Sequence, residues 1–291
     1  MEQVHAALND IDRDGSRTAM ALRQAIDAVL DGPRTGRYSW HQLTKTEKTH
    51  LGTQVEISIA EALGLRQGRT TGYEVAGSPI NFRFARDHTW LIPPGGVGEL
   101  FLLVAANDEK SHWSAGVVRA ERHLLARGGN RDGKQALSAS GRTAVQWLFR
   151  DTPLPENSLL HLPEQILTAV LSHRSGQERI DELFRTVQCQ KISSNAIATV
   201  TMQRDYAKRI RHSRQTLSRE GTVIFGSYEA HSNLARKLGL PVPGPSEWIS
   251  ARLARFADHH GCRPTIELDG DQWTLATDDD VIEPVPRIPM H

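Results

Sequence analysis

The chain has 291 residues, of which 38% are hydrophobic and 24% charged, and its formal net charge is +1. This composition supports one large or two ordinary globular domains and excludes a disordered chain, and the two cysteines, Cys189 and Cys262, are too few for a disulfide framework. No run approaches the ~18 apolar residues of a membrane span, and the N-terminus lacks a secretory signal, so we expect a cytoplasmic protein without a membrane partner.

The first half of the chain predicts helices followed by strands, which is the pattern of an α/β core. Apolar residues recur at helical spacing from Thr18 to Leu30, where Gly32-Pro33 ends the pattern. A second helix, expected from about Thr46 to Leu63, contains Glu56 and has Leu51, Val55, Ile57 and Ile59 among its apolar positions. Strands are expected at 72–76 and 79–84, joined at Gly77-Ser78, in the continuous apolar run 98–106, and at 114–119.

The proline-rich segment 151–157 has the composition of an inter-domain connection and predicts two domains, residues 1–152 and 153–291. Helical patterns follow at 163–171, 175–187 and 193–203, and then come a basic helix and a strand at 221–226. Helix, turn, helix, strand is the order of a winged helix. Near the C-terminus, Asp269-Gly270 between apolar flanks predicts a hairpin with a type I′ turn.

Charge is distributed unevenly along the second half. Residues 204–220 carry six basic side chains against Asp205 and Glu220, whereas the tail from Glu267 to Glu283 is acidic. The near-neutral total therefore conceals a basic segment of the kind that binds DNA. A run of charge is more often a solvated face than a binding site, so this segment alone is weak support.

Uncommon strings occur in order over nearly the whole chain. They include Gly36-Arg-Tyr-Ser-Trp, Lys45-Thr-Glu-Lys-Thr-His50, Trp90-Leu-Ile-Pro93, Asn130-Arg-Asp-Gly-Lys134 and Asp205-Tyr-Ala-Lys-Arg-Ile-Arg211. Through these strings the sequence resembles the NaeI family of type II restriction endonucleases. The resemblance implies an α/β restriction-endonuclease-like core of the PD-(D/E)xK type. It also implies a C-terminal winged-helix domain that resembles the DNA-binding domain of the catabolite activator protein.

The family's catalytic pattern, as the resemblance implies, is degenerate in this chain. It consists of a glutamate on a helix, an aspartate that opens a hairpin, and an aspartate-x-lysine on the second strand. Glu56 matches the glutamate, but Gly72, Asn81 and Arg83 stand where the two aspartates and the lysine belong. Since Mg²⁺ is held by carboxylates, we expect no metal ligand beyond Glu56 and no cofactor. Arg83 can stabilise negative charge, but its high pKa makes it a poor proton acceptor.

Two alternatives stand beside the inactive site. Glu74 is a possible substitute acid on the same strand face as Gly72, although it is displaced by roughly 6.5 to 7 Å along the strand. In the competing interpretation, Glu56, Glu74 and Asp87 assemble an altered site of a working Mg²⁺-dependent endonuclease. Without the surrounding family strings, Asn81 and Arg83 would be interpreted as ordinary polar strand residues.

A second candidate site lies in the basic segment. If 193–203 is a recognition helix, Ser194, Asn195, Thr199 and Gln203 present hydroxyls and amides to base edges. The other candidate DNA-contacting residues are Arg204, Lys208, Arg209, Arg211 and Arg214 in the basic segment, which would contact phosphates, and Lys45 and Lys48 in the first half. The alternative is an amphipathic helix packed on its neighbours, with a solvated basic face.

The resemblance also implies partners: two DNA duplexes per protomer and a homodimer matched to palindromic, GC-rich DNA. A phosphotyrosine intermediate at Tyr206 is a weaker hypothesis than packing of that side chain. His259-His260 with Cys262 is not expected to bind a metal, because adjacent histidines point apart on most backbones. The sequence thus predicts a sequence-specific double-stranded DNA-binding protein that has lost nuclease activity.

Overall fold

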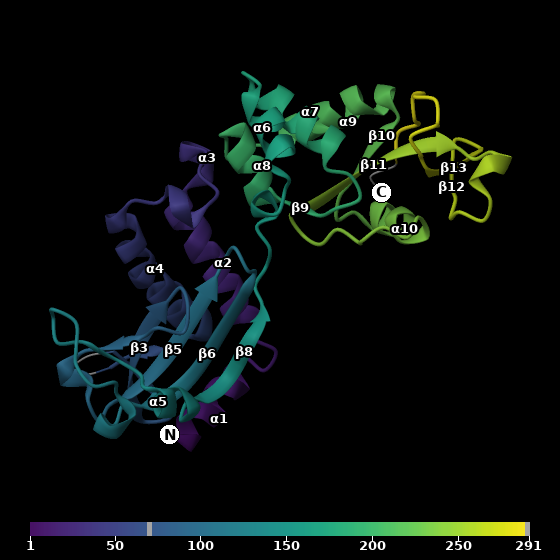
Figure 1. Cartoon of the computed structure of the whole chain (residues 1–291). Helices are drawn as coiled ribbons and strands as arrows, with labels where there is room; N and C mark the ends of the chain where they lie inside the picture. The colour runs from purple at the N-terminus through teal and green to yellow at the C-terminus, as the bar shows by residue number, and fades with distance from the viewer. Residues whose placement is uncertain (69–71, 289–291) are drawn as a thin grey trace. The chain divides into compact units, whose positions relative to one another are not determined.

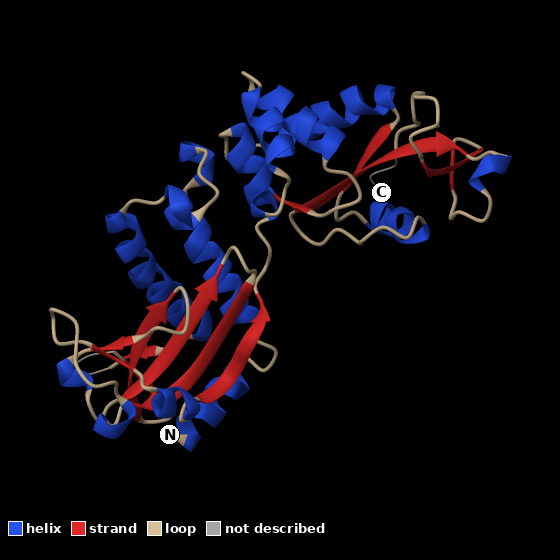
Figure 2. Ribbon diagram, in the orientation of Figure 1, coloured by secondary structure: helices blue, strands red, loops and turns tan. Residues whose placement is uncertain are grey.

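The computed structural model describes residues 1–68 and 72–288. The chain separates into two compact units, which we call the N-terminal unit (Met1–Leu30 and Ser39–Glu156) and the C-terminal unit (Asp31–Tyr38 and Asn157–His291). Each unit mixes helices and strands, so the α/β class is confirmed (Figure 2). Within the described ranges, no helix has both the length and the apolarity that crossing a membrane requires.

The N-terminal unit is built on a six-stranded sheet with the order β1-β2-β3-β5-β6-β8. Strands β3 and β5 pair in parallel, and the other neighbours are antiparallel. Helices α2 and α4 lie along one face of this sheet (Figure 1). The elements are α1 (Glu2–Ile11), α2 (Ser16–Leu30), α4 (Lys45–Leu63), α5 (Ala139–Thr143), β1 (Arg66–Gln67), β2 (Tyr73–Val75), β3 (Ser78–Ala85), β4 (Leu91–Ile92), β5 (Leu100–Asn107), β6 (His112–Arg119), β7 (Gln135–Ala136) and β8 (Gln146–Pro153).

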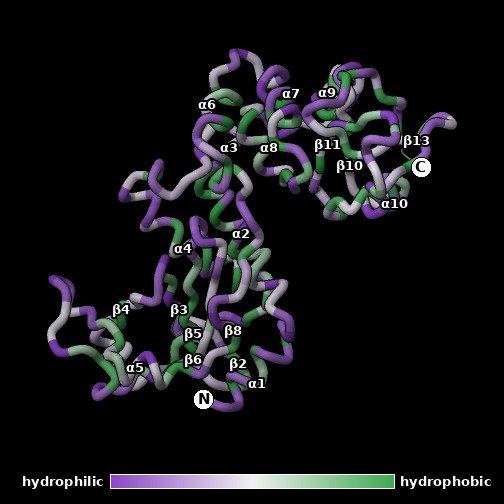
Figure 3. The backbone as a smooth tube through the Cα atoms, turned by 45° about the vertical axis from the view of Figure 1, so that its right-hand side comes forward, coloured by the Kyte–Doolittle hydropathy of each residue, from purple (hydrophilic) through white to green (hydrophobic). Residues whose placement is uncertain are grey.

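Both faces of this sheet are covered, which explains the continuous apolar run of β5. All eight residues of β5 are buried, and the strand is hydrophobic along nearly its whole length in Figure 3. Leu102 and Val104 point into the core beneath α2 and α4. Phe101 and Leu103 point to the opposite face, into a second core that contains Trp90. Alternate residues of each central strand therefore face two different environments.

The predicted helices of this unit are confirmed, with one correction. The first helix ends at Leu30 as expected, and Gly32–Thr35 then forms the separate short helix α3, in whose first turn a proline is tolerated. Ile57 is 51% exposed, whereas Leu51, Val55 and Ile59 are buried at four-residue spacing. Ile57 lies two positions from the buried residues on either side, and this places it on the outer face of the helix.

The predicted hairpin is confirmed, but its turn is one residue earlier than expected. The turn residues are Ala76 and Gly77, not Gly77 and Ser78, and Val75 pairs with Ser78. Ala76 and Gly77 have φ values of 48° and 72°. A two-residue type I′ turn requires positive φ at both positions, and this pair provides it.

The C-terminal unit packs several helices against a second sheet with the order β10-β11-β13-β12, and β9 also pairs with β11. The hairpin predicted at Asp269-Gly270 is confirmed, since both turn residues have positive φ and Leu268 pairs with Asp271. The elements are α3, α6 (Glu164–Ser172), α7 (Gly176–Thr186), β9 (Ile192–Ser193), α8 (Ser194–Thr201), α9 (Ala207–Leu217), β10 (Thr222–Phe225), α10 (Glu229–Lys237), β11 (Glu247–Arg255), β12 (Ile266–Leu268) and β13 (Asp271–Leu275).

Candidate functional site

Helix α4 carries Glu56, the acid that matches the family pattern. The helix begins at a capping box in which Thr44 accepts from the Glu47 N–H and the Glu47 carboxylate accepts from Thr44. It ends at Gly64, whose φ of 63° suits a glycine. Leu51, Val55 and Ile59 fasten one side of the helix to the sheet, and Glu56 lies half-buried beside that side.

Gly72 directly precedes β2, and Asn81 and Arg83 lie on β3 beyond its last residue paired with β2. The β2–β3 pairing stops at Tyr73 and Ile80, so Gly72 lies next to the backbone of Asn81. Asn81 and Arg83 alternate with Ile80 and Phe82, which point into the core, and the Arg83 guanidinium lies 5.4 Å from the centroid of the Phe101 ring. Gly72 thus lies beside Asn81, and Arg83 follows two residues later on β3.

Glu56 is joined to this frame by two side chains. Burial raises the pKa of Glu56, while the charge of Arg83 and a hydrogen bond with Tyr73 oppose that rise. Burial and the neighbouring Glu56 raise the pKa of the Tyr73 hydroxyl. Burial lowers the pKa of Arg83, and Glu56 opposes that change. Tyr73 was not among the predicted site residues, although strand alternation, which turns its side chain toward α4, could have indicated it.

The residues at this place do not fit a bound Mg²⁺. A Cβ atom at Gly72 would lie 2.5 Å from the Ile80 carbonyl oxygen, so an aspartate there would require the hairpin backbone to shift. The Asn81 amide donates to the Leu100 carbonyl at 3.5 Å and carries no charge. The remaining carboxylate, Glu56, already interacts with Tyr73 and Arg83. A hard cation that prefers anionic oxygen ligands gains little from this set.

The substitute acids considered from the sequence do not join Glu56. Glu74 pairs with Pro79 across the hairpin and lines a surface hollow with Arg66. Asp87 lies beyond the end of β3, where its Oδ1 accepts a hydrogen bond from the Asn107 amide at 2.9 Å. Among the described residues, neither Glu56, Glu74 nor Asp87 belongs to a group of three or more acids, histidines or cysteines that lie close enough together to hold one metal ion. The altered metal site is therefore not assembled in this structure.

Lys45 and Lys48 lie in the first turn of α4. Lys45 is exposed, and the Lys48 ammonium lies 5.6 Å from the centroid of the Trp40 ring. Arg86 also lies 5.6 Å from that ring and forms an ion pair with Glu109. Both lysines thus lie on the surface, and Lys48 forms a cation–π contact with the Trp40 ring.

The structure corrects the choice of 193–203 as a helix that reads bases. Every residue of α8 from Ala196 to Thr201 is buried. Thr199 is only 2% exposed and packs under α3, where a Cβ atom at Gly32 would lie 2.0 Å from its hydroxyl oxygen. Ser194 and Asn195 are half-buried at the start of the helix. A helix enclosed in this way cannot present Thr199 to DNA.

Helix α9 has the exposed polar face instead. Ile210, Ser213 and Leu217 are buried on its inner side. Lys208, Arg211, His212 and Gln215 are exposed at three- and four-residue spacing and so share one face. Most of the helix is hydrophilic in Figure 3.

The remaining candidates in the basic segment have partners within the unit. The Arg209 Nε donates to Gln203 at 2.7 Å, and Arg204 lies 3.7 Å from Asp31. Arg214 donates from Nε to the Ile224 carbonyl at 3.0 Å. The ring of Tyr206 packs edge-on against Trp248, with the centroids 5.6 Å apart, which agrees with a packing role rather than covalent chemistry.

The expected divergence of His259 and His260 is wrong. Their ring centroids are 3.9 Å apart, and both Nε2 atoms contact Asp280, at 2.8 and 3.1 Å. The Ala257 N–H donates to His260 Nδ1 at 3.0 Å, so the hydrogen of this ring is on Nε2 and points to Asp280. The Thr277 N–H and the two histidines lower the pKa of Asp280. Hydrogen bonds thus occupy the atoms that would otherwise ligate a metal.

Comparison of the sequence with known proteins assigns the chain to a family. The sequence profile described as "Restriction endonuclease NaeI" matches residues 2–284. The chain is 39% identical over 300 residues to "Type II restriction enzyme NaeI" from Lentzea aerocolonigenes, an alignment that covers 99% of this chain and 94% of the relative. The resemblance stated from the sequence strings is thereby confirmed. This chain belongs to the NaeI family of restriction endonucleases.

Proposed function

We propose that this protein binds double-stranded DNA in a sequence-specific manner and does not cleave it. The N-terminal unit is the endonuclease-like domain, and the C-terminal unit is a winged-helix domain. The observation that carries the loss of cleavage is that Gly72 and Asn81 offer no carboxylate at the two positions where the family pattern has aspartates, and that a Cβ atom at Gly72 would overlap the Ile80 carbonyl oxygen.

The electrostatics of the degenerate site support this proposal. Hydrolysis of a phosphodiester in such a site needs an activated water and stabilisation of the developing negative charge. Arg83 supplies positive charge, but it stays protonated and cannot accept the proton of the attacking water. Glu56 is the only carboxylate of the family set, and it already interacts with Tyr73 and Arg83. Loss of several catalytic elements together removes many orders of magnitude in rate.

The arrangement of the C-terminal unit supports DNA binding. Helices α7, α8 and α9 are followed by β10, α10 and β11, and β9 pairs with β11. In a helix-turn-helix the second helix is the recognition helix, and α9 is the second of the pair α8 and α9. We therefore assign base contacts to the exposed face of α9 in place of α8. Lys208 and Arg211 contact phosphates, and Gln215 reaches toward base edges.

By analogy with its family, the protein acts as a homodimer on palindromic DNA, with two duplex-binding surfaces in each protomer. The cation surface of Lys45, Lys48 and Arg86 around Trp40 is the corresponding phosphate-binding region of the N-terminal unit. By the same analogy we infer a cytoplasmic location.

The test is a paired binding and cleavage assay. The protein is incubated with plasmid rich in GC palindromes in the presence of Mg²⁺ or Mn²⁺, and the relative from Lentzea aerocolonigenes serves as the positive control. We expect retarded DNA without new fragments. Specific fragments at substoichiometric protein that disappear in Glu56→Gln would instead establish a working, metal-dependent endonuclease.

A further inference from the structure

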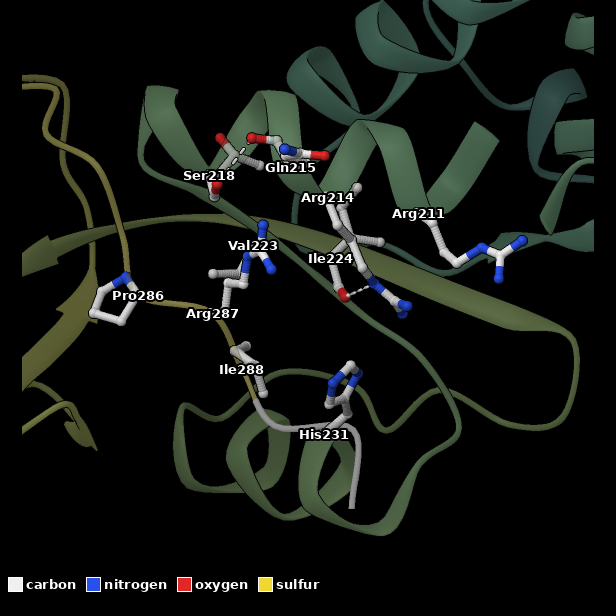
Figure 4. Close-up of a pocket in the computed structure, with 11 residues that line it drawn as sticks. Arg211, Arg214, Gln215, Ser218, Val223, Ile224, His231, Pro286, Arg287 and Ile288 are labelled. Carbon is white, nitrogen blue, oxygen red and sulfur yellow. Dashed lines mark hydrogen bonds between the residues drawn. The ribbon is translucent and has the colours of Figure 1, made fainter. Parts of the chain in front are cut away.

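The C-terminal unit contains a cavity of about 230 Å³ beside α9. Its walls are α9, the edge strand β10, α10 and the C-terminal segment 286–288. Figure 4 shows Arg211 and Arg214 projecting from α9, with Arg287 and His231 on the segments opposite that helix. Segments distant in the sequence thus bring basic side chains to one cavity.

The charge of the lining is entirely positive. Arg211, Arg214 and Arg287 line the cavity, and none of the 11 lining residues is an acid. Arg214 is held in position, because its Nε donates to the Ile224 carbonyl at 3.0 Å and its guanidinium lies 5.8 Å from the centroid of the Tyr228 ring. Burial lowers the pKa of Arg214, but a guanidinium with this starting value stays charged at neutral pH. A cation fixed before the ligand arrives loses little entropy on binding.

The rest of the lining adds a hydrogen-bonding group and an apolar wall. His231 Nδ1 accepts from the Gly226 N–H at 2.9 Å, which fixes the tautomer with the hydrogen on Nε2. Val223, Ile224 and Ile288 line the cavity with aliphatic surface. Small-ligand sites combine apolar walls with a few placed polar groups in this way.

We propose that this cavity binds a phosphate ester of a nucleotide. The guanidinium groups hold the phosphate oxygens, because their paired N–H donors match oxyanion geometry, and the aliphatic wall accommodates the attached sugar. The phosphate comes either from a free nucleotide or from a nucleotide of bound DNA. The inference deepens the proposed function, since the cavity shares Arg211 and Gln215 with the DNA-contacting face of α9.

The experiment uses the full chain in phosphate-free buffer. Calorimetric titration compares deoxyguanosine 5′-monophosphate, deoxyguanosine and inorganic phosphate, and duplex DNA affinity is measured in parallel. The variant is Arg287→Ala, since Arg287 is exposed and its removal leaves the core intact. The matched control is Arg236→Ala, which removes the same charge from an exposed position on α10 outside the lining.

Binding of the monophosphate at least tenfold tighter than of the nucleoside, and weakened about tenfold in Arg287→Ala only, supports a free-nucleotide site. If the monophosphate does not bind but Arg287→Ala alone weakens duplex binding by that factor, the phosphate belongs to DNA and the site stands. Equal behaviour of the two variants in both assays overturns the proposal. If the monophosphate binds and duplex DNA does not, the proposed function fails while the cavity assignment survives.

Discussion

Replacing Gly72 by aspartate restores the family's residue type but, we expect, destabilises the protein. The new Cβ atom would start 2.5 Å from the Ile80 carbonyl oxygen, so the hairpin must open by about 0.9 Å to reach an ordinary contact of 3.4 Å. Forcing such overlap into packed structure costs about 1–3 kcal/mol. The φ of 68° at this position lies in the left-handed region, where a non-glycine residue has a higher conformational energy, and this adds a second cost.

Gly77→Asp in the same hairpin separates these two costs. Gly77 has a similar φ of 72°, but a Cβ atom there meets nothing within 4 Å. Both variants therefore carry the backbone cost, and only Gly72→Asp carries the overlap. We expect Gly72→Asp to be about 1–3 kcal/mol less stable than Gly77→Asp in chemical denaturation.

A cleavage assay tests the same reasoning with a triple variant that combines Gly72→Asp, Asn81→Asp and Arg83→Lys. We expect no specific cutting with Mg²⁺, because the close backbone approach at residue 72 prevents its carboxylate from taking the metal-facing position. Equal stability of the two single variants, together with cleavage by the triple variant, would refute this reasoning. The loss of activity would then result from the missing carboxylate and lysine side chains alone, and the backbone approach at residue 72 would play no part.

Three further outcomes follow from the contacts described above and from the half-buried carboxyl of Asp27, which forms an ion pair with Arg23. Removing the hydroxyl in Tyr73→Phe should raise the pKa of Glu56 further, because the hydrogen bond favours the charged carboxylate; carbon-detected NMR titration of the glutamate measures it, and an unchanged pKa contradicts the contact. Burial raises the pKa of Asp27 from 3.8 to about 6, so its stabilising contribution is complete below pH 3.8 and is lost as the pH rises to 6. We therefore compare the free energy of unfolding of Asp27→Asn with that of the unmodified protein at two pH values. The difference should favour the variant by about 1–3 kcal/mol more at pH 7 than at pH 3.5. A difference that does not change with pH would argue against this reasoning. Lys208→Ala should weaken binding to all duplex sequences alike and reduce the slope of log affinity against log salt by about 1, whereas a sequence-dependent loss would assign it to base contact.

Local signals predicted those parts of the fold that depend on neighbouring residues. The apolar positions Leu51, Val55 and Ile59, spaced four residues apart, indicate α4 without reference to the rest of the chain. The turn at Asp269-Gly270 is equally local, because those two residue types tolerate the positive φ that it needs.

Long-range contacts decided what the sequence did not predict. Thr199 has the polarity of a surface residue, but it is buried, and one element that packs on it is α3, more than 160 positions earlier in the chain. His259 and His260 converge because Asp280 lies between their Nε2 atoms, which no property of the histidine pair itself indicates. At the degenerate site the frame followed from the family strings, whereas the Tyr73–Glu56 contact required the position of α4 over the hairpin.

The assignment of residues 31–38 to the C-terminal unit has a consequence for any attempt to divide the protein. The polypeptide passes between the two units three times, after Leu30, after Tyr38 and after Glu156. A fragment that starts at Asn157 lacks α3 and uncovers the side of α8 on which Thr199 lies. A single proteolytic nick near residue 156 leaves residues 31–38 covalently joined to the N-terminal unit, although they pack in the C-terminal unit, so the two fragments stay associated through α3 until the C-terminal unit unfolds.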